Sequence, residues 1–109
     1  MGSILLKSND GKHSYKLEYN RSSIVRMEEN GFNVADIDKK PISTITLLIR
    51  GAFYMHNPSL TDSEIDEITE QVGNSVGLVE GLVQMYQDAL TSLAGGSKKD
   101  AKNFKWEKA

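Results

Sequence analysis

The stretch GAFYMHNPSLTDSEIDEI, residues 51–68, decides the fold because it joins an apolar run to an acidic one. Pro58 disfavours helical geometry at the residue before it, so the first helix must end near this point. Thr61 and Glu64 then form a capping-box pattern, in which each side chain satisfies a free backbone N–H of a new helix. The stretch therefore predicts a corner between two helices, with Pro58, Thr61 and Glu64 as structural residues.

His56 lies at this corner, close in sequence to Asp62, Glu64 and Asp66. These side chains are the one group in the sequence that resembles a metal or acid–base site. Metal ligands that converge from one helix are spaced i, i+4, and His56 has no such partner. An imidazole at a helix end can instead hydrogen-bond the last free carbonyls. We therefore interpret His56 as a helix-end residue and predict no catalytic residue, no bound metal and no cofactor.

The segments before the corner predict a hairpin and two helices. Alternation of Tyr15, Leu17 and Tyr19 beside the Asp-Gly pair at 10–11 is typical of a β-hairpin, here over residues 4–19. A helix over about 21–31 follows and ends at Gly31. A central buried helix over about 41–56 begins at Pro41. Its broad apolar face is formed by Ile42, Ile45, Leu48, Ile49, Ala52 and Phe53.

Two more helices are predicted after the corner, over about 62–72 and 75–94. The last one carries two neighbouring apolar stripes, which together are wider than one packing neighbour needs. One stripe is Val76, Val79, Val83, Tyr86, Leu90 and Leu93, and the other is Leu78, Leu82, Met85 and Ala89. We expect a partner-binding groove around Leu78, Leu82, Met85 and Tyr86, with plain core packing as the alternative. Gly77 and Gly81 predict the close approach of another helix.

These elements predict a mainly α protein with an N-terminal β-hairpin (α+β), in which about four helices pack on the two strands. Residues 1–96 form a single globular domain. Residues 97–109 hold five lysines and no hydrophobic periodicity, so we expect a flexible Lys-rich tail. Phe104 and Trp106 in this tail either anchor a partner or fold back on the core.

Composition narrows the class of protein further. The 109 residues contain no cysteine, which excludes disulfides and thiol chemistry and favours a cytoplasmic protein. No apolar run is long enough to span a membrane. Between Arg50 and Lys98 there are seven carboxylates and no basic side chain. This acidic block between basic ends can favour self-association, but solvated helix faces are the preferred explanation. A pI of about 5.6 argues against nucleic-acid binding.

The spacing of several motifs resembles the small tail assembly chaperones of tailed bacteriophages and prophages. The likeness covers roughly residues 12–93, and its elements are Gly31-Phe32, Pro41, Gly51-Ala52-Phe53, the run from His56 to Thr61, and Gly73 with Leu78, Leu82 and Tyr86. The resemblance implies a protein that is not an enzyme and acts in the host bacterial cytoplasm. It implies that the chain binds the tape measure protein and the tail tube protein. The alternative is a small nucleic-acid-binding regulator that acts through its basic C-terminal tail.

Overall fold

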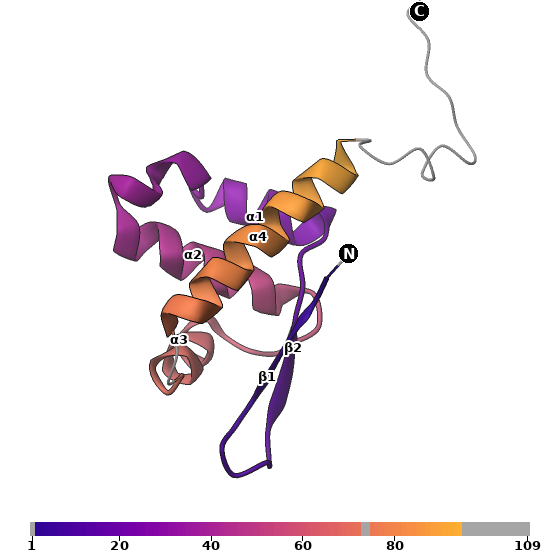
Figure 1. The fold of residues 1–109 in the computed structure, drawn as a ribbon, viewed down its shortest axis with the longest axis vertical. Coiled ribbons are helices and arrows are strands. Elements are labelled where there is room, and N and C mark those ends of the chain that lie inside the picture. Colours follow the sequence, from indigo (N-terminus) through magenta and orange to yellow (C-terminus); the bar gives the residue numbers. More distant parts are fainter. Residues whose placement is uncertain (1, 73–74, 95–109) are drawn as a thin grey trace, which may run out of the picture.

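The structure is a computed structural model, and it describes residues 2–72 and 75–94. Its elements in chain order are β1 (Ile4–Lys7), β2 (Ser14–Leu17), α1 (Arg21–Glu29), the 3-10 helix η1 (Val34–Asp38), α2 (Pro41–Tyr54), α3 (Asp62–Glu70) and α4 (Ser75–Leu93) (Figure 1). The predicted mainly α fold with an N-terminal hairpin is confirmed. Each of the helices α1 to α4 ends one or two residues before its predicted end.

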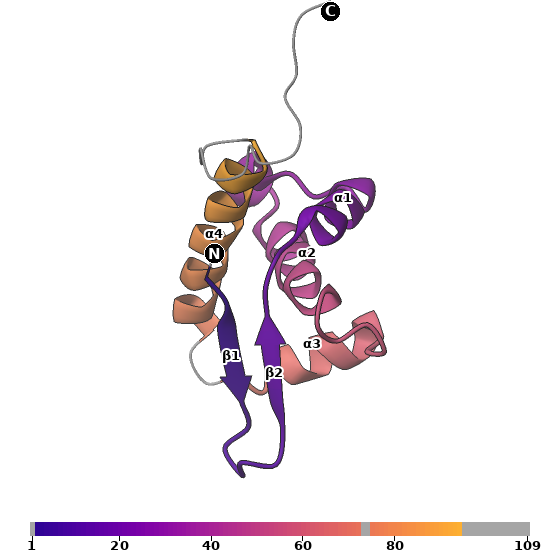
Figure 2. The same cartoon turned by 90° about the vertical axis from the view of Figure 1, so that its right-hand side faces the viewer.

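The hairpin is antiparallel, with Ile4 opposite Leu17 and Leu6 opposite Tyr15. The connection spans residues 8–13 rather than a two-residue turn, and Gly11 adopts the left-handed region at φ 73°. Asp10 braces the connection, because its carboxylate accepts hydrogen bonds from Ser8 Oγ at 2.5 Å and from the Lys12 N–H at 2.9 Å. Figure 2 shows the hairpin between α4 on one side and α1, α2 and α3 on the other.

Local signals start the helices where the sequence predicts. Asn20 caps α1 with its side-chain oxygen, which accepts from the Ser23 N–H at 2.8 Å. After α1 the chain reverses through Gly31, which has a φ of 96°. Glycine adopts a positive φ with little steric strain because it has no Cβ atom. Thr61 and Glu64 form the predicted capping box at α3, with reciprocal bonds of 3.0 and 3.2 Å. These contacts are confirmed as structural.

Helix α2 lies at the centre of the core. Leu48, Ala52 and Phe53 are fully buried, and the neighbouring α1, η1, α3, α4 and β2 all pack on this helix. Ile42 is the exception to its predicted apolar face, since 79% of this residue is exposed. The prediction for Ile42 was wrong because periodicity gives the direction of a side chain but not how far the neighbouring helices extend.

Tyr19 connects α2 to the aromatic part of the core. Its hydroxyl donates a buried hydrogen bond of 2.6 Å to the Leu48 carbonyl, and burial raises the pKa of this phenol. Its ring meets the ring of Tyr86 edge-on at 5.7 Å, and Phe32 meets Tyr86 in the same way at 5.1 Å. A Tyr hydroxyl that is kept neutral and hydrogen-bonded can be buried at little cost.

Gly51 sets how closely α1 approaches α2. A Cβ atom added at Gly51 would overlap the Sδ and Cγ atoms of Met27, a side chain that is itself buried. At Gly81 on α4 the nearest atom to an added Cβ is Ile4 Cδ1, at 3.2 Å. The close neighbour of Gly81 is therefore strand β1, and the prediction of a helix there was wrong.

In the described residues, none of the helices is long and apolar enough to cross a membrane.

Gly51→Ala should lower the free energy of unfolding by about 1–3 kcal/mol, because overpacking a core costs more than the added helix propensity gives back. Gly81→Ala should be neutral or stabilising, since only the end of one side chain has to move. Urea unfolding of both variants measures the difference. Met27→Ala should also cost less in the Gly51→Ala protein than in the wild type. Equal stability of the two glycine variants would contradict the close contact.

Candidate functional site

The corner after α2 is a structural junction. His56 Nε2 lies 2.8 Å from the Glu18 Oε1 atom just after β2, in a hydrogen bond between side chains that are 30% and 18% exposed. The prediction that His56 bonds the last helix carbonyls was wrong. Asn57 does this, because its side-chain N–H₂ donates to the Phe53 carbonyl at 3.3 Å and to the Lys16 carbonyl at 3.1 Å. His56 and Asn57 therefore fasten the end of α2 to β2, while the exposed Pro58 follows where the chain turns.

The carboxylates near His56 in sequence point to other partners. Asp66 forms a bidentate ion pair with Arg50, with oxygen to nitrogen distances of 2.7 and 3.1 Å. Asp62 lies 4.0 Å from the same guanidinium and accepts a bond of 3.3 Å from the Tyr54 hydroxyl. Hydrogen bonding to Arg50 lowers the pKa of Asp66, and hydrogen bonding to Thr61 lowers that of Glu64. The acids brace α3 against α2 and do not converge on the imidazole.

No group of three or more His, Cys, Asp or Glu side chains in residues 2–72 and 75–94 could hold a metal ion.

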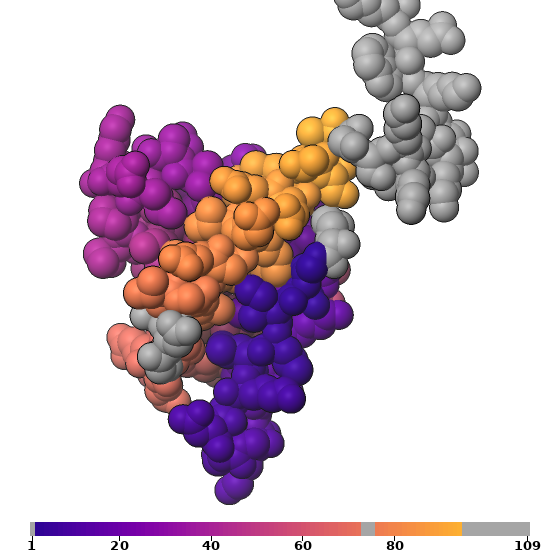
Figure 3. Space-filling view, in the orientation of Figure 1, coloured from indigo at the N-terminus to yellow at the C-terminus, as the bar shows by residue number. Residues whose placement is uncertain are grey.

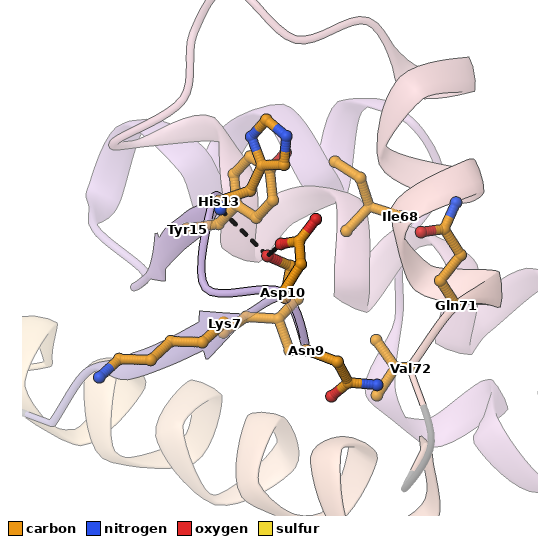
Figure 4. A pocket seen from close by; sticks show the side chains of 10 residues that line it. Lys7, Asn9, Asp10, His13, Tyr15, Ile68, Gln71 and Val72 are labelled. Atoms are coloured by element: carbon orange, nitrogen blue, oxygen red, sulfur yellow. Dashed lines mark hydrogen bonds between the residues drawn. The ribbon is translucent and has the colours of Figure 1, made fainter.

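A hollow of about 450 Å³ lies between the hairpin connection and the end of α3 (Figure 4). Its apolar side is lined by Leu6, Tyr15, Ile68 and Val72. Two of the polar side chains that line it already bond to each other, because Ser8 Oγ donates to Asp10 and accepts from the His13 N–H at 3.0 Å. The hydrogen bond from Ser8 lowers the pKa of Asp10. The rim residues Lys7, Asp10 and His13 are exposed. We interpret the hollow as the space beneath a braced turn, and not as a prepared ligand site.

Most of the predicted groove on α4 lies inside the protein. Leu82, Met85 and Tyr86 are 0%, 7% and 4% exposed, and Leu78 is half-buried. Plain core packing, the alternative, therefore accounts for these side chains, and they have almost no surface to offer a partner in this conformation. The other predicted partner residues, Phe104 and Trp106, lie outside the described residues.

The apolar surface of α4 lies instead on the first of the two predicted stripes. Val76 is 70% exposed and Leu90 is 37% exposed, and Val83 lies between them and is half-buried. These positions are seven residues apart, so they follow one side of the helix. We call Val76, Val79, Val83 and Leu90 the α4 stripe, Val79 being half-buried as well. Figure 3 shows α4 crossing this side of the molecule at the surface, beside the hairpin.

Comparison with known proteins gives a family without a known activity. Residues 1–109 match the family described as Domain of unknown function (DUF5055), and the chain belongs to it. No curated protein and no solved structure matches the chain.

Asp66→Asn should lower the free energy of unfolding at pH 7 by about 0.5–1 kcal/mol, a partly exposed ion pair being worth no more. The pKa of Asp66 is lowered in the folded protein, so its stabilising effect is present above the ordinary value of 3.8. The difference between the variant and the wild type should therefore shrink as the pH falls through and below that value. Glu67→Gln on the same helix is the control and should change little. A difference that does not depend on pH would contradict an ionic role for Asp66.

Proposed function

We propose that this protein is a phage or prophage tail assembly chaperone, which works by binding other proteins and has no enzymatic activity. The observation that carries the proposal is the α4 stripe, an apolar surface on a long helix whose opposite side is built into the core. Exposed apolar surface of this kind on a small protein is typical of protein-binding sites. The sequence resemblance supplies the partner, the tape measure protein.

The spacing of the α4 stripe favours a helical partner. Val76 and Leu90 are about 21 Å apart along the helix axis, at a rise of 1.5 Å per residue. This length matches three to four turns of a second helix packed alongside, with its own apolar side chains between those of the stripe. A long tape measure protein is expected to be largely helical, so it can present such segments before it is enclosed by the tail tube.

The polar residues beside the stripe, of which Glu80 is charged, add selectivity. Glu80 and Gln87 occupy equivalent positions on its solvent side, and both are exposed. A carboxylate at the edge of an apolar helix contact favours a basic residue on the facing helix and disfavours an acidic one. The expected partner segment is therefore an amphipathic helix with Lys or Arg next to its apolar face.

Chaperone action requires that this contact be reversible. The stripe is narrow, with two side chains that are half-buried, so a partner helix gains only part of the apolar burial that a permanent interface provides. A contact of this size can shield an aggregation-prone segment and release it when tube subunits bind. We expect the tail tube protein to compete for the partner rather than for the stripe.

The double variant Val76→Glu with Leu90→Glu should keep the fold, because both side chains are exposed. It should lose the ability to keep the tape measure protein soluble when the two are produced together in a bacterium. Solubility of the tape measure protein, scored by fractionation and co-purification, is the measurement. Val25→Glu is the control. Val25 is 46% exposed on α1, so this variant also replaces an exposed apolar side chain by glutamate, but away from the stripe. Unchanged solubilisation by the double variant would overturn the proposed binding surface.

A further inference from the structure

The two edges of the hairpin differ in how their backbone groups are satisfied. The Ser8 N–H donates to the His13 carbonyl at 2.9 Å, which marks residues 8 and 13 as a hydrogen-bonded pair. Such pairs alternate along an antiparallel ladder, so Leu6 with Tyr15 and Ile4 with Leu17 are also hydrogen-bonded pairs. The N–H and C=O groups of residues 5, 7, 16 and 18 therefore point away from the ladder.

The outer edge of β2 is closed by the end of α2. The Glu18 N–H donates to the Ala52 carbonyl at 3.0 Å, and the Lys16 carbonyl accepts from the Asn57 side chain at 3.1 Å. In the part of the chain that the structure describes, no other element hydrogen-bonds to the outer edge of β1. Among the described residues, no hydrogen bond engages the backbone of Leu5 or Lys7. Leu5 is 56% exposed, a large apolar side chain at the middle of an open strand edge.

We infer that two copies of this chain associate through their β1 strands, paired antiparallel about a two-fold axis at Leu5, to form one four-stranded sheet. An open edge whose N–H and C=O groups point outward can bind another strand through main-chain hydrogen bonds. Main-chain hydrogen bonds do not distinguish one strand from another, so the side chains determine which strand binds. The side chains of a second β1 strand are complementary to those of the first.

Self-pairing about Leu5 places apolar side chains opposite apolar ones at residues 4 to 6. Leu5 meets Leu5 of the second copy on the outer face, and Ile4 meets Leu6 on the inner face, where both are half-buried. Lys7 meets Ser3, so no two charges of the same sign are directly opposite. The two Lys7 side chains are about 13 Å apart along the strands, beyond the screening length in physiological salt.

Other registers of the same edge fit less well. A shift by two residues would place Lys7 opposite Leu5 and leave an apolar side chain without a match. A shift by one residue would place Leu5 of one copy opposite Leu6 of the other. The N–H and C=O groups of Leu6 point toward β2, so the two residues could not form hydrogen bonds with each other. The open edge spans only the four residues of β1, which predicts a weak dimer that depends on concentration. This inference concerns the purified chain alone and does not rest on the proposed function.

The test is the oligomeric state of the purified full-length chain, measured by analytical ultracentrifugation over a range of concentrations. The wild type should form dimers in the micromolar to millimolar range. Leu5→Lys should raise the dimer dissociation constant at least about tenfold, since it puts two like charges directly opposite in place of an apolar pair. Ile42→Lys, the same change at another exposed residue, should leave the dissociation constant unchanged. Circular dichroism checks that both variants are folded.

Mixing variants tests the position of the two-fold axis. Leu5→Lys and Leu5→Glu should each be monomeric alone, and an equimolar mixture should form a heterodimer, because only pairing of residue 5 with residue 5 brings the opposite charges together. Leu5→Pro should also be folded but monomeric, since the Leu5 N–H points away from β2. A wild-type chain that stays monomeric throughout, or a dimer that persists in Leu5→Lys, would overturn the inference.

Discussion

The fold depends on a hydrogen bond between the C-terminal end of helix α2 and the outer edge of the hairpin, because each supplies a backbone group that the other lacks. Ala52 lies in the last turn of α2, so its carbonyl has no partner within the helix. Glu18 follows β2 with its N–H pointing out of the ladder, and the two groups meet at 3.0 Å. Each would be costly to bury alone. Their pairing requires the backbones of helix and strand to lie close together, which the small side chain of the buried Ala52 allows.

This junction explains why the most suggestive part of the sequence is structural. His56 and Asn57 are polar residues in a conspicuous place, yet their side chains reach the segment around β2, at Glu18 and Lys16. Arg50 of α2 forms an ion pair with Asp66 of α3 and so has a structural role as well. The corner is held by charged and polar pairs, and the apolar residues around it build the core. Within the described residues, exposed apolar side chains and unpaired backbone groups that could bind a partner lie elsewhere, on α4 and along the edge of β1.

Local signals in the sequence gave reliable predictions because their physics acts within a few residues. The capping box of Thr61 and Glu64, Pro41 at the start of α2 and the left-handed Gly31 all lie where the patterns place them. Contacts between distant residues could not be predicted in this way. His56 and Glu18 are 38 positions apart, and nothing in either neighbourhood indicates the other.

The division of α4 between core and surface shows the same limit. Its two apolar stripes are adjacent and similar in composition, so periodicity cannot tell which of them faces the other helices. The structure buries Leu82 and Met85 of one stripe and leaves Val76 and Leu90 of the other exposed. Tyr86 belongs to the same stripe as Val76 and is nevertheless buried. Gly51 is a related case, because a glycine within an apolar helix indicates close approach only once Met27 is known to lie opposite.

Amide hydrogen exchange at Glu18 tests the central junction most directly. An N–H on the outer edge of a short hairpin would ordinarily exchange fast, and the Lys16 N–H, which points the same way without a partner in the described residues, provides the reference. If α2 closes this edge, the Glu18 amide should exchange only through global unfolding, while the Lys16 amide exchanges much faster. Similar, fast exchange at both amides would contradict the account.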